Sequence, residues 1–521
     1  MTFLLTQFIT TVYADERESL EQLRNTTLSL IDMLVKEGVL SKTAAENLVK
    51  EAQAAKQSGK TDQEIADQVD SAADKVVRVQ YVPESVKQQM KDEIKQDVMD
   101  NLNYKAGERL GVPEWIDRIT PEGDLRLRYQ REGFSSNNFP ASSFNQLSIR
   151  NSSISNTTTD TSLWRVRARL GAKIKITDWL EGGVRASTGS LGDPISGNQN
   201  LDTSTGKYTF ALDRAFLKAH PYQWATLSGG RMENPWFHTD LMWDPDLAFD
   251  GIAASASPKI NENLSTFGTV GAFPIEQLQS SQSPKSVNGS NKWLYGAQGG
   301  IIWNLPFNSS LKLGIALYDF TNVEGKPNTV SDPNLNDNSV PAFHVKGNNT
   351  FDINENTAPT CGVSSSSYSA GCALASKFKV LNLIGQFDYA RFNPVHVILT
   401  TDYIQNLGFD AHEILLRTGN VYQKETQGYQ VKLAVGMPET LHKGDWQLFG
   451  AYKRLEADST MDAFTDDDFN LGGTDTKGWI MGASYGLDKN VWTTVRWMSS
   501  SQISGYPLSI DTVFFDLQAK F

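Results

Sequence analysis

The sequence has no long apolar run and no excess of positive charge. Its 521 residues contain no stretch of about 18 consecutive apolar residues, which excludes a transmembrane helix. Lys and Arg number 48 against 60 Asp and Glu, so the net charge is −12 and the pI is near 5.1. A chain this acidic is poorly suited to bind nucleic acid, and no such partner is expected.

Cysteine and histidine are scarce as well. The six histidines are scattered, and Cys361 and Cys372 lack the CxxC or histidine spacing of a zinc site. We therefore expect neither a metal nor a cofactor. Both cysteines lie in a polar segment rich in Ser, Asn and Gly, which favours a disulfide bond formed in an oxidising compartment over two free thiols.

No catalytic constellation is recognisable. The stretch "GASYG", Gly482 to Gly486, matches the esterase pattern, but it lies within a strand-like pattern and not in a strand–turn–helix elbow. The run "DAFTDDDFN" contains Asp466, Asp467 and Asp468, which could bind divalent cations weakly. A solvated loop is the favoured interpretation of this run, and we do not expect an enzyme.

The first hundred residues differ in pattern from the rest. "FLLTQFITTVYA" followed by the acidic "DERES" indicates the end of a secretory signal at 1–14; its basic n-region is missing, so the true start is expected upstream. Residues 15–110 have helical spacing and a capping box at Thr61–Glu64. The row from Val86 to Leu102 recurs every four residues and keeps no strict heptad. A small amphipathic bundle and a self-associating coiled coil both remain open.

From about residue 122 the apolar period changes to two, as in β-strands. In "LWRVRARLGAKIKI", residues 163–176, apolar or small residues alternate with arginine and lysine. We expect sixteen strands, near residues 123–132, 163–176, 179–189, 207–220, 223–232, 247–257, 264–273, 291–303, 310–320, 376–390, 395–407, 427–437, 444–457, 476–487, 490–500 and 510–521.

The connections between these strands alternate in length. Short ones, such as 177–178, 221–222 and 391–394, are followed by long polar ones, such as 190–206, 321–375 and 408–426. A soluble sandwich has no reason to place all its long loops at one end, whereas an outer-membrane barrel has short periplasmic turns and long external loops. Since each strand needs only one apolar face, a mean hydropathy of −0.38 is compatible with this fold. The sequence predicts a mainly β protein with a 16-stranded transmembrane barrel over 116–521.

Aromatic residues strengthen this interpretation. Trp164, Trp179 and Trp224 lie near strand ends, where an aromatic girdle would place them. The last twelve residues, "IDTVFFDLQAKF", place Phe515, Leu517 and Phe521 on one face. A last strand that ends in an aromatic residue resembles the assembly signal of bacterial outer-membrane proteins, which implies the assembly machinery and outer-membrane lipids as partners.

Two stretches resemble one family in particular. "EWIDRITPEGDLRLRY" and "WRVRARLGAKIKITDWLEGGVRASTG", after "VPESVKQQMKDEI", are similar to the "putative porin" family of Gram-negative bacteria. The resemblance covers most of the chain from residue 15 and implies an outer-membrane β-barrel porin, a homotrimer, with a periplasmic helical extension. That extension could contact peptidoglycan, help to trimerise the barrel or plug the pore; a tether to the cell wall is slightly favoured.

The alternation at 163–176 indicates which face of the predicted strand contacts water. An arginine on the lipid side at mid-membrane would cost roughly 2–4 kcal/mol, so Trp164 and Leu170 are expected to face lipid and the cations to face the lumen. In a water-filled lumen these charges are expected to stay hydrated and to need no buried partner. The predicted basic wall consists of Arg126, Arg128, Arg165, Arg167, Arg169, Lys173, Lys175 and Arg185.

The third long loop supplies charge of the opposite sign. Aromatic residues are out of place on a loop free in water, so "ENPWFHTDLMWDPD" is expected to fold into the barrel, narrow it and oppose the basic wall; an exposed surface loop is the alternative. Its predicted constriction residues are Glu233, Trp236, Asp240, Trp243, Asp244 and Asp246. Rings of charge favour a weak preference for anions.

The sequence thus predicts a porin for the passive diffusion of small hydrophilic solutes and ions. The alternative is a tether between outer membrane and cell wall, or a surface adhesin, built on a barrel without an open pore. The long loop that carries Cys361 and Cys372 would suit surface recognition.

Overall fold

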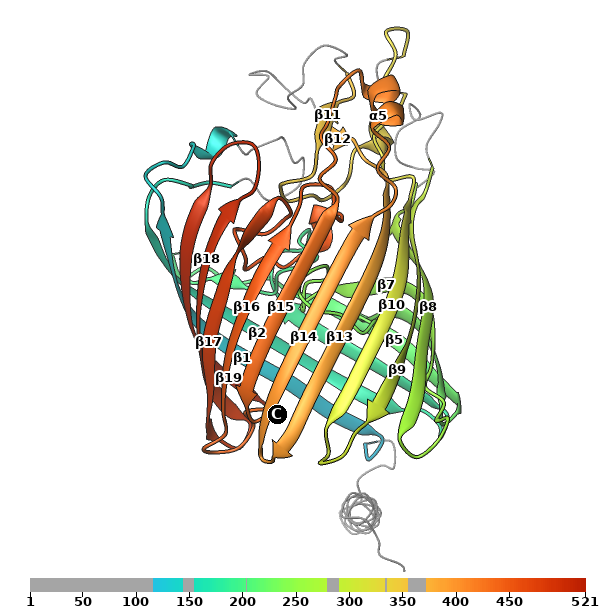
Figure 1. Cartoon of the computed structure of the whole chain (residues 1–521), viewed down its shortest axis with the longest axis vertical. Coiled ribbons are helices and arrows are strands. Elements are labelled where there is room, and N and C mark those ends of the chain that lie inside the picture. The colour runs from blue at the N-terminus through green and yellow to red at the C-terminus, as the bar shows by residue number, and fades with distance from the viewer. Residues whose placement is uncertain (1–115, 144–153, 203, 279–289, 333–334, 355–371) are drawn as a thin grey trace, which may run out of the picture. The chain divides into compact units, whose positions relative to one another are not determined.

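The computed structural model describes residues 116–143, 154–202, 204–278, 290–332, 335–354 and 372–521. The expected signal remnant at 1–14 and the expected helical segment at 15–110 lie outside these residues. None of the helices within the described ranges is both long enough and apolar enough to cross a membrane. Sixteen antiparallel strands form a closed barrel (Figure 1), because β1 (Ile119–Phe134) pairs with β2 on one side and with β19 on the other.

The expected sixteen-stranded architecture is confirmed, and each expected strand coincides with an observed one to within a few residues. After β1 the barrel strands are β2 (Thr161–Lys175), β3 (Leu180–Thr188), β5 (Phe210–Tyr222), β6 (Ala225–Glu233), β7 (Ala248–Ala256), β8 (Leu264–Glu276), β9 (Lys292–Asn304), β10 (Ser310–Thr321), β13 (Phe378–Phe392), β14 (Val395–Asn406), β15 (Gln427–Gly436), β16 (Trp446–Leu455), β17 (Thr476–Asp488), β18 (Val491–Gln502) and β19 (Ser509–Lys520).

The long connections contain regular structure that the alternation of the strands does not predict. The two-residue strand β4 (Gln199–Asn200) pairs with β2, and β11 (Thr350–Asp352) pairs with β12 (Cys372–Leu374). The helix α5 (Ala411–Thr418) begins after Asp410, whose carboxylate accepts two backbone N–H groups, and ends at Gly419 with φ 72°. Strands β11 and β12 and helix α5 lie at the long-loop end of the barrel (Figure 1).

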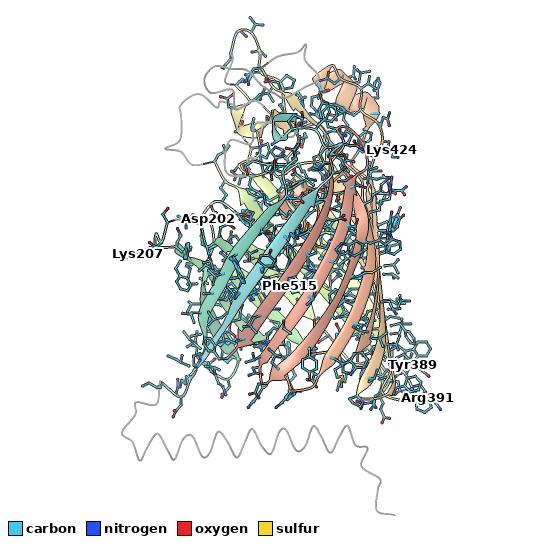
Figure 2. The ribbon with its side chains drawn as sticks, turned by 90° about the vertical axis from the view of Figure 1, so that its left-hand side faces the viewer. Asp202, Lys207, Tyr389, Arg391, Lys424 and Phe515 are labelled. Atoms are coloured by element: carbon cyan, nitrogen blue, oxygen red, sulfur yellow. The ribbon has the colours of Figure 1, made fainter. Side chains whose placement is uncertain are left out.

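The two faces of the wall differ in chemistry. Outward-pointing side chains are large, apolar and exposed, such as Leu125 and Trp164, which are 48% and 54% exposed. Phe515 occupies an equivalent place on the outer surface of β19 (Figure 2). The alternate residues on the same strands, such as Arg128 on β1, are buried inside the barrel. An apolar exterior around a charged interior is the arrangement that lipid outside and water inside require.

The pairing between the first and last strands, β1 and β19, extends to the last residue of the chain. Gly123 and Phe521 exchange two backbone hydrogen bonds of 3.0 Å. A Cβ at position 123 would lie 2.5 Å from the Phe521 ring, so the ring packs over this glycine because it has no side chain. Phe515 and Leu517 point outward on the same strand. The role of these three residues as an assembly signal remains a prediction.

Candidate functional site

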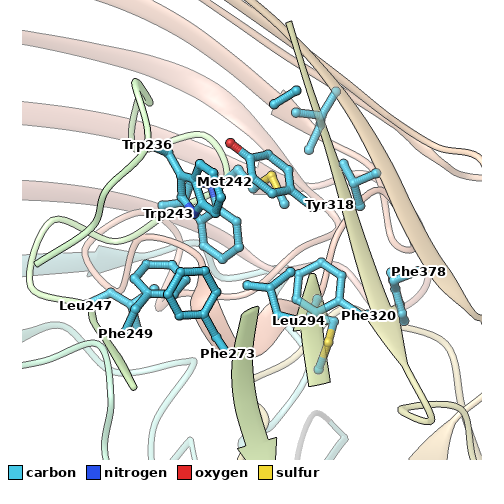
Figure 3. Packing of buried hydrophobic residues seen from close by; sticks show 14 of the residues in the cluster. Trp236, Met242, Trp243, Leu247, Phe249, Phe273, Leu294, Tyr318, Phe320 and Phe378 are labelled. Atoms are coloured by element: carbon cyan, nitrogen blue, oxygen red, sulfur yellow. The ribbon is translucent and has the colours of Figure 1, made fainter. Parts of the chain in front are cut away.

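The connection between β6 and β7, residues 234–247, lies inside the barrel. Its side chains Trp236, Leu241, Met242 and Trp243 are almost completely buried. Trp243 packs edge-on against Phe249 of β7 and Tyr318 of β10, with ring centroids 5.2 Å apart in each case (Figure 3). Because these partners come from the inner faces of the strands, the loop packs onto the inner wall and forms an apolar core within the lumen.

Hydrogen bonds attach one part of this loop to β9 and the next part to β14. The Phe237 N–H donates to Oε1 of Gln298 at 2.7 Å, and Nε2 of Gln298 donates to the Phe237 carbonyl at 2.8 Å. Two residues further on, the Thr239 hydroxyl donates to the carboxylate of Asp402 on β14. This loop therefore contacts strands on either side of β10 and β13 and occupies part of the lumen cross-section.

Asp240 extends the attachment to the next two strands. Its carboxylate accepts hydrogen bonds from Gln430 of β15 at 2.6 Å and from Lys453 of β16 at 3.2 Å. Burial raises the pKa of Asp240, but the charges of Lys453 and Lys432 outweigh that effect and hold it below the ordinary range. Asp240 is therefore an ionised anchor for the loop.

A second loop inside the barrel, residues 456–475 between β16 and β17, was not anticipated. Asp466 is 6% exposed, and Phe464 stacks on Phe320 with centroids 6.1 Å apart. The interpretation of this run as a solvated loop is wrong. Phe464 and Phe469 stand among its acidic residues, as the aromatic residues do in the first loop, and this mixture is the sequence signal that could have identified it.

The central cations of the basic wall are paired, so the expectation that they need no buried partner is wrong. Arg128 is 1% exposed and bonds Asp516 of β19 through Nε at 2.7 Å and Asp468 of the second loop at 2.6 Å. Arg185 pairs with Asp213 of β5. A buried guanidinium without a partner would be costly, because burial removes the water that would otherwise hydrate it.

Arg167 and Arg169 share two carboxylates. Arg167 lies 2.7 Å from Asp246 of the first loop and 3.1 Å from Asp124 of β1; Arg169 lies 3.0 Å and 2.7 Å from the same two groups. Burial raises the pKa of Asp246, but both arginines together hold it below its ordinary value. The acidic loop therefore touches this part of the wall.

Of the remaining predicted cations, two bond neutral amide groups and two are exposed. Arg126 donates to Asn198 at 2.5 Å, and Arg165 donates to Asn200 at 2.8 Å. Lys173 and Lys175, beside the short turn after β2, are exposed and pair with Glu122 and Asp178. The eight cations therefore do not form one uniform wall.

Among the predicted acidic residues, Glu233 lies apart from the others. It is the last residue of β6, is half exposed, and pairs with Arg214 and Lys218 of β5 at 3.0 and 2.9 Å. Glu233 thus stays at the strand end and takes no part in the packing of the loop.

Asp244 joins the two loops. Its carboxylate accepts the N–H of Asp246 at 2.6 Å and that of Asp467 at 3.1 Å. Carboxylate oxygens of Asp244, Asp466 and Asp467 lie within 4.8 Å of one another. Burial and the neighbouring acids raise the pKa of Asp244 well above its ordinary value, and that of Asp467 to about 8. Asp466 pairs with Lys453 at 3.0 Å, whereas the repulsion between Asp244 and Asp467 is relieved by protonation.

We expect this contact to weaken as the pH rises. Folding raises the pKa of Asp467 from its ordinary value near 4 to about 8, so the folded protein holds this proton more tightly than the unfolded chain does. The resulting stabilisation is complete below about pH 4 and is lost as the pH rises through 8. Wild-type protein should therefore melt at a clearly lower temperature at pH 9 than at pH 6, as measured by tryptophan fluorescence. Asp467→Asn, which stays neutral, should lose most of this difference, and Asp178→Asn at an exposed turn should keep it. An unchanged difference in Asp467→Asn would contradict the assignment.

The cysteine pair is only half described. Cys372 is buried at the start of β12, and Cys361 lies outside the described residues. The disulfide bond between them remains a prediction.

A closed antiparallel barrel of sixteen strands, with an apolar exterior and loops packed inside a charged lumen, defines a β-barrel membrane protein with the architecture of the porins. The chain belongs to the family described as "Putative porin", whose sequence profile matches residues 24–521. No functionally curated protein matches it.

Solved structures with a similar fold are distant in sequence. OprB of Pseudomonas putida is 11% identical, with 80% of this chain and 97% of that chain covered and a TM-score of 0.43. OmpF of Salmonella typhi, in complex with daunomycin, is 10% identical over 77% and 97% of the two chains, with a TM-score of 0.40. The outer-membrane channel DcaP of Acinetobacter baumannii is 9% identical over 77% and 97%, with a TM-score of 0.38.

Proposed function

We propose that this protein forms a water-filled channel in the outer membrane of a Gram-negative bacterium, through which small hydrophilic solutes and ions diffuse passively. The observation that carries the proposal is the closed sixteen-stranded barrel with a charged inner face. Barrels of this strand number are wide enough to leave an aqueous channel. The inward loops reduce the cross-section and so limit the size of the solute.

The lumen surface favours polar solutes. The charged residues that line a cavity of about 230 Å³ beside the first loop are Arg169, Arg185, Arg231, Asp193, Asp213 and Asp246. Side-by-side charges of both signs hold water firmly, and a hydrophilic solute replaces that water with its own hydrogen bonds, whereas an apolar solute does not. The net effect on ions is a weak preference for anions, because cations outnumber acids on β1 and β2 taken together.

Several partners belong to the same proposal. Homotrimers, contact with outer-membrane lipids, insertion by the assembly machinery and a periplasmic N-terminal segment that contacts peptidoglycan fit a porin. A barrel that only tethers the membrane to the cell wall, or that acts as an adhesin, is the competing function. Single-channel recording in planar bilayers separates the two, since a porin gives steady conductance steps and a closed tether gives none.

Charge selectivity tests the placement of the arginines of β2. We expect Arg165→Gln, Arg167→Gln and Arg169→Gln together to shift the reversal potential toward cations by about 10 mV, out of the ~59 mV available across a tenfold salt gradient. Glutamine is preferred to glutamate because Asp124 and Asp246 contact two of these residues. Removing three exposed turn charges, at Lys259, Lys443 and Lys489, should leave the potential unchanged. An equal shift in both triple variants would refute the placement.

A further inference from the structure

A second cavity of about 230 Å³ lies against the inner wall beside Asp240. Its lining comes from β1 and the neighbouring strands β15, β16, β17, β18 and β19, all through inward-facing side chains. Asp240 reaches it from the first loop. The other charged residues of the lining are Arg126, Arg128, Lys432, Arg496 and Asp516.

Two of these four cations have acidic partners. Arg128 pairs with Asp516 and Asp468, and Arg496 pairs with the same Asp468. Asp240, the other acid of the lining, pairs with Lys453, which lies outside the lining and also pairs with Asp466.

The other two cations, Arg126 and Lys432, form no ion pair within the part of the chain that the structure describes. Arg126 donates to the neutral amide of Asn198, and the Lys432 ammonium lies 5.1 Å from the centre of the Phe449 ring. Lys432 is close enough to Asp240 to lower its pKa, but it makes no contact with the carboxylate. Two positive charges therefore face the cavity without a matching acid in contact.

This excess is local. The cavity beside the first loop is lined by three arginines and by three acids, Asp193, Asp213 and Asp246, so its charges balance. The cavity beside the first loop therefore shows no such excess of cations.

Polar atoms at the second cavity also lack partners. Nε of Arg126 and Oε1 of Gln430 are buried and have no hydrogen-bond partner among the described residues. A buried polar atom without a partner costs about 1–3 kcal/mol, so such atoms in a cavity indicate that another molecule contacts them.

We propose that this cavity binds a small dianionic solute, with one carboxylate or phosphate group at Arg126 and the second charge near Lys432. This inference rests on the proposed channel function and names the solute class for which the lumen is built. The size fits, because a cavity of about 150 Å³ already admits a benzene ring. Guanidinium is suited to the role, since its planar donors match carboxylate and phosphate oxygens. The solute would dwell here during its passage between the two sides of the barrel.

Calorimetric titration of the full-length protein in detergent tests the site independently of conduction. Succinate, an extended dicarboxylate, and inorganic phosphate, a compact dianion, are the two probes, and acetate is the singly charged control. At least one dianion should bind wild type, and acetate should bind it at least roughly tenfold more weakly. Tighter binding of succinate would identify an extended solute, and tighter binding of phosphate a compact one; either supports the site.

The variant Arg126→Gln/Lys432→Gln should raise the dissociation constant at least roughly tenfold. The matched control is Lys312→Gln, an inward cation of β10 that lies over Phe237 and does not line this cavity, and it should bind as wild type does. Lys432→Gln alone serves if the double variant fails to fold.

Absence of binding by both dianions, equal binding of acetate, or an unchanged dissociation constant in a folded variant would overturn the proposal. Conductance steps in potassium chloride without dianion binding would refute this site and leave the channel function standing. Binding of a dianion without conductance steps would refute the channel function and leave this site standing.

Discussion

Replacing Trp243 with alanine should enlarge the open-channel conductance, and it should destabilise the protein by roughly 3–5 kcal/mol, the usual cost of truncating a buried tryptophan. Trp243 is 1% exposed and contacts four rings, those of Phe249, Tyr318, Phe320 and Phe464. Two of these rings belong to the wall on β10 and one belongs to the second loop, so the indole holds both loops in place. Without it, the loops should spend more time away from the wall.

Planar-bilayer recording measures the first effect, and urea unfolding of the protein in lipid vesicles measures the second. The control is Trp479→Ala, because Trp479 is equally large but points outward and is 53% exposed. It should change neither the conductance nor its noise. If Trp243→Ala also left the conductance as in wild type, the first loop would not limit the pore.

The strands could be predicted because their signal is local. Along β2, for example, every second residue from Trp164 to Ile174 is apolar or small, and Thr177-Asp178 ends the run. Lipid on one side and a charged interior on the other impose this alternation on each strand separately, so no knowledge of the pairing was needed. The even number of strands and the alternating loop lengths then determined the barrel.

The interior could be predicted only in part, since its contacts join distant residues. The aromatic residues of 236–243 indicated that this segment is buried, but not which strands it contacts. Arg128 and Asp468 are 340 positions apart, and nothing near Arg128 in the sequence shows that an acid will reach it. The helix α5 had a local signal in Asp410 and Gly419, yet its eight residues were too few to stand out in a polar loop.

Asp468 takes part in two buried ion pairs, so its neutralisation should lower the free energy of unfolding more than that of any other charged residue in the lumen. Its carboxylate bonds Arg128 at 2.6 Å and also pairs with Arg496, and burial raises its pKa while these two cations lower it far below the ordinary value. Asp468→Asn would leave Arg496 without an acidic partner and Arg128 with Asp516 alone. We expect a loss of about 3 kcal/mol in urea unfolding, as for other buried pairs that lose one member.

The comparison that decides the point is with an exposed pair of the same chemistry. Arg231 and Asp250 lie 2.7 Å apart, but the Asp250 side chain is 56% exposed, so Asp250→Asn should cost at most about 1 kcal/mol. Adding Arg496→Gln to Asp468→Asn should restore part of the lost stability, because it removes the cation that the first substitution leaves unpaired. Equal losses for the two single variants, or a further loss in the double variant, would show that the loop is held by its aromatic residues and not by its charges.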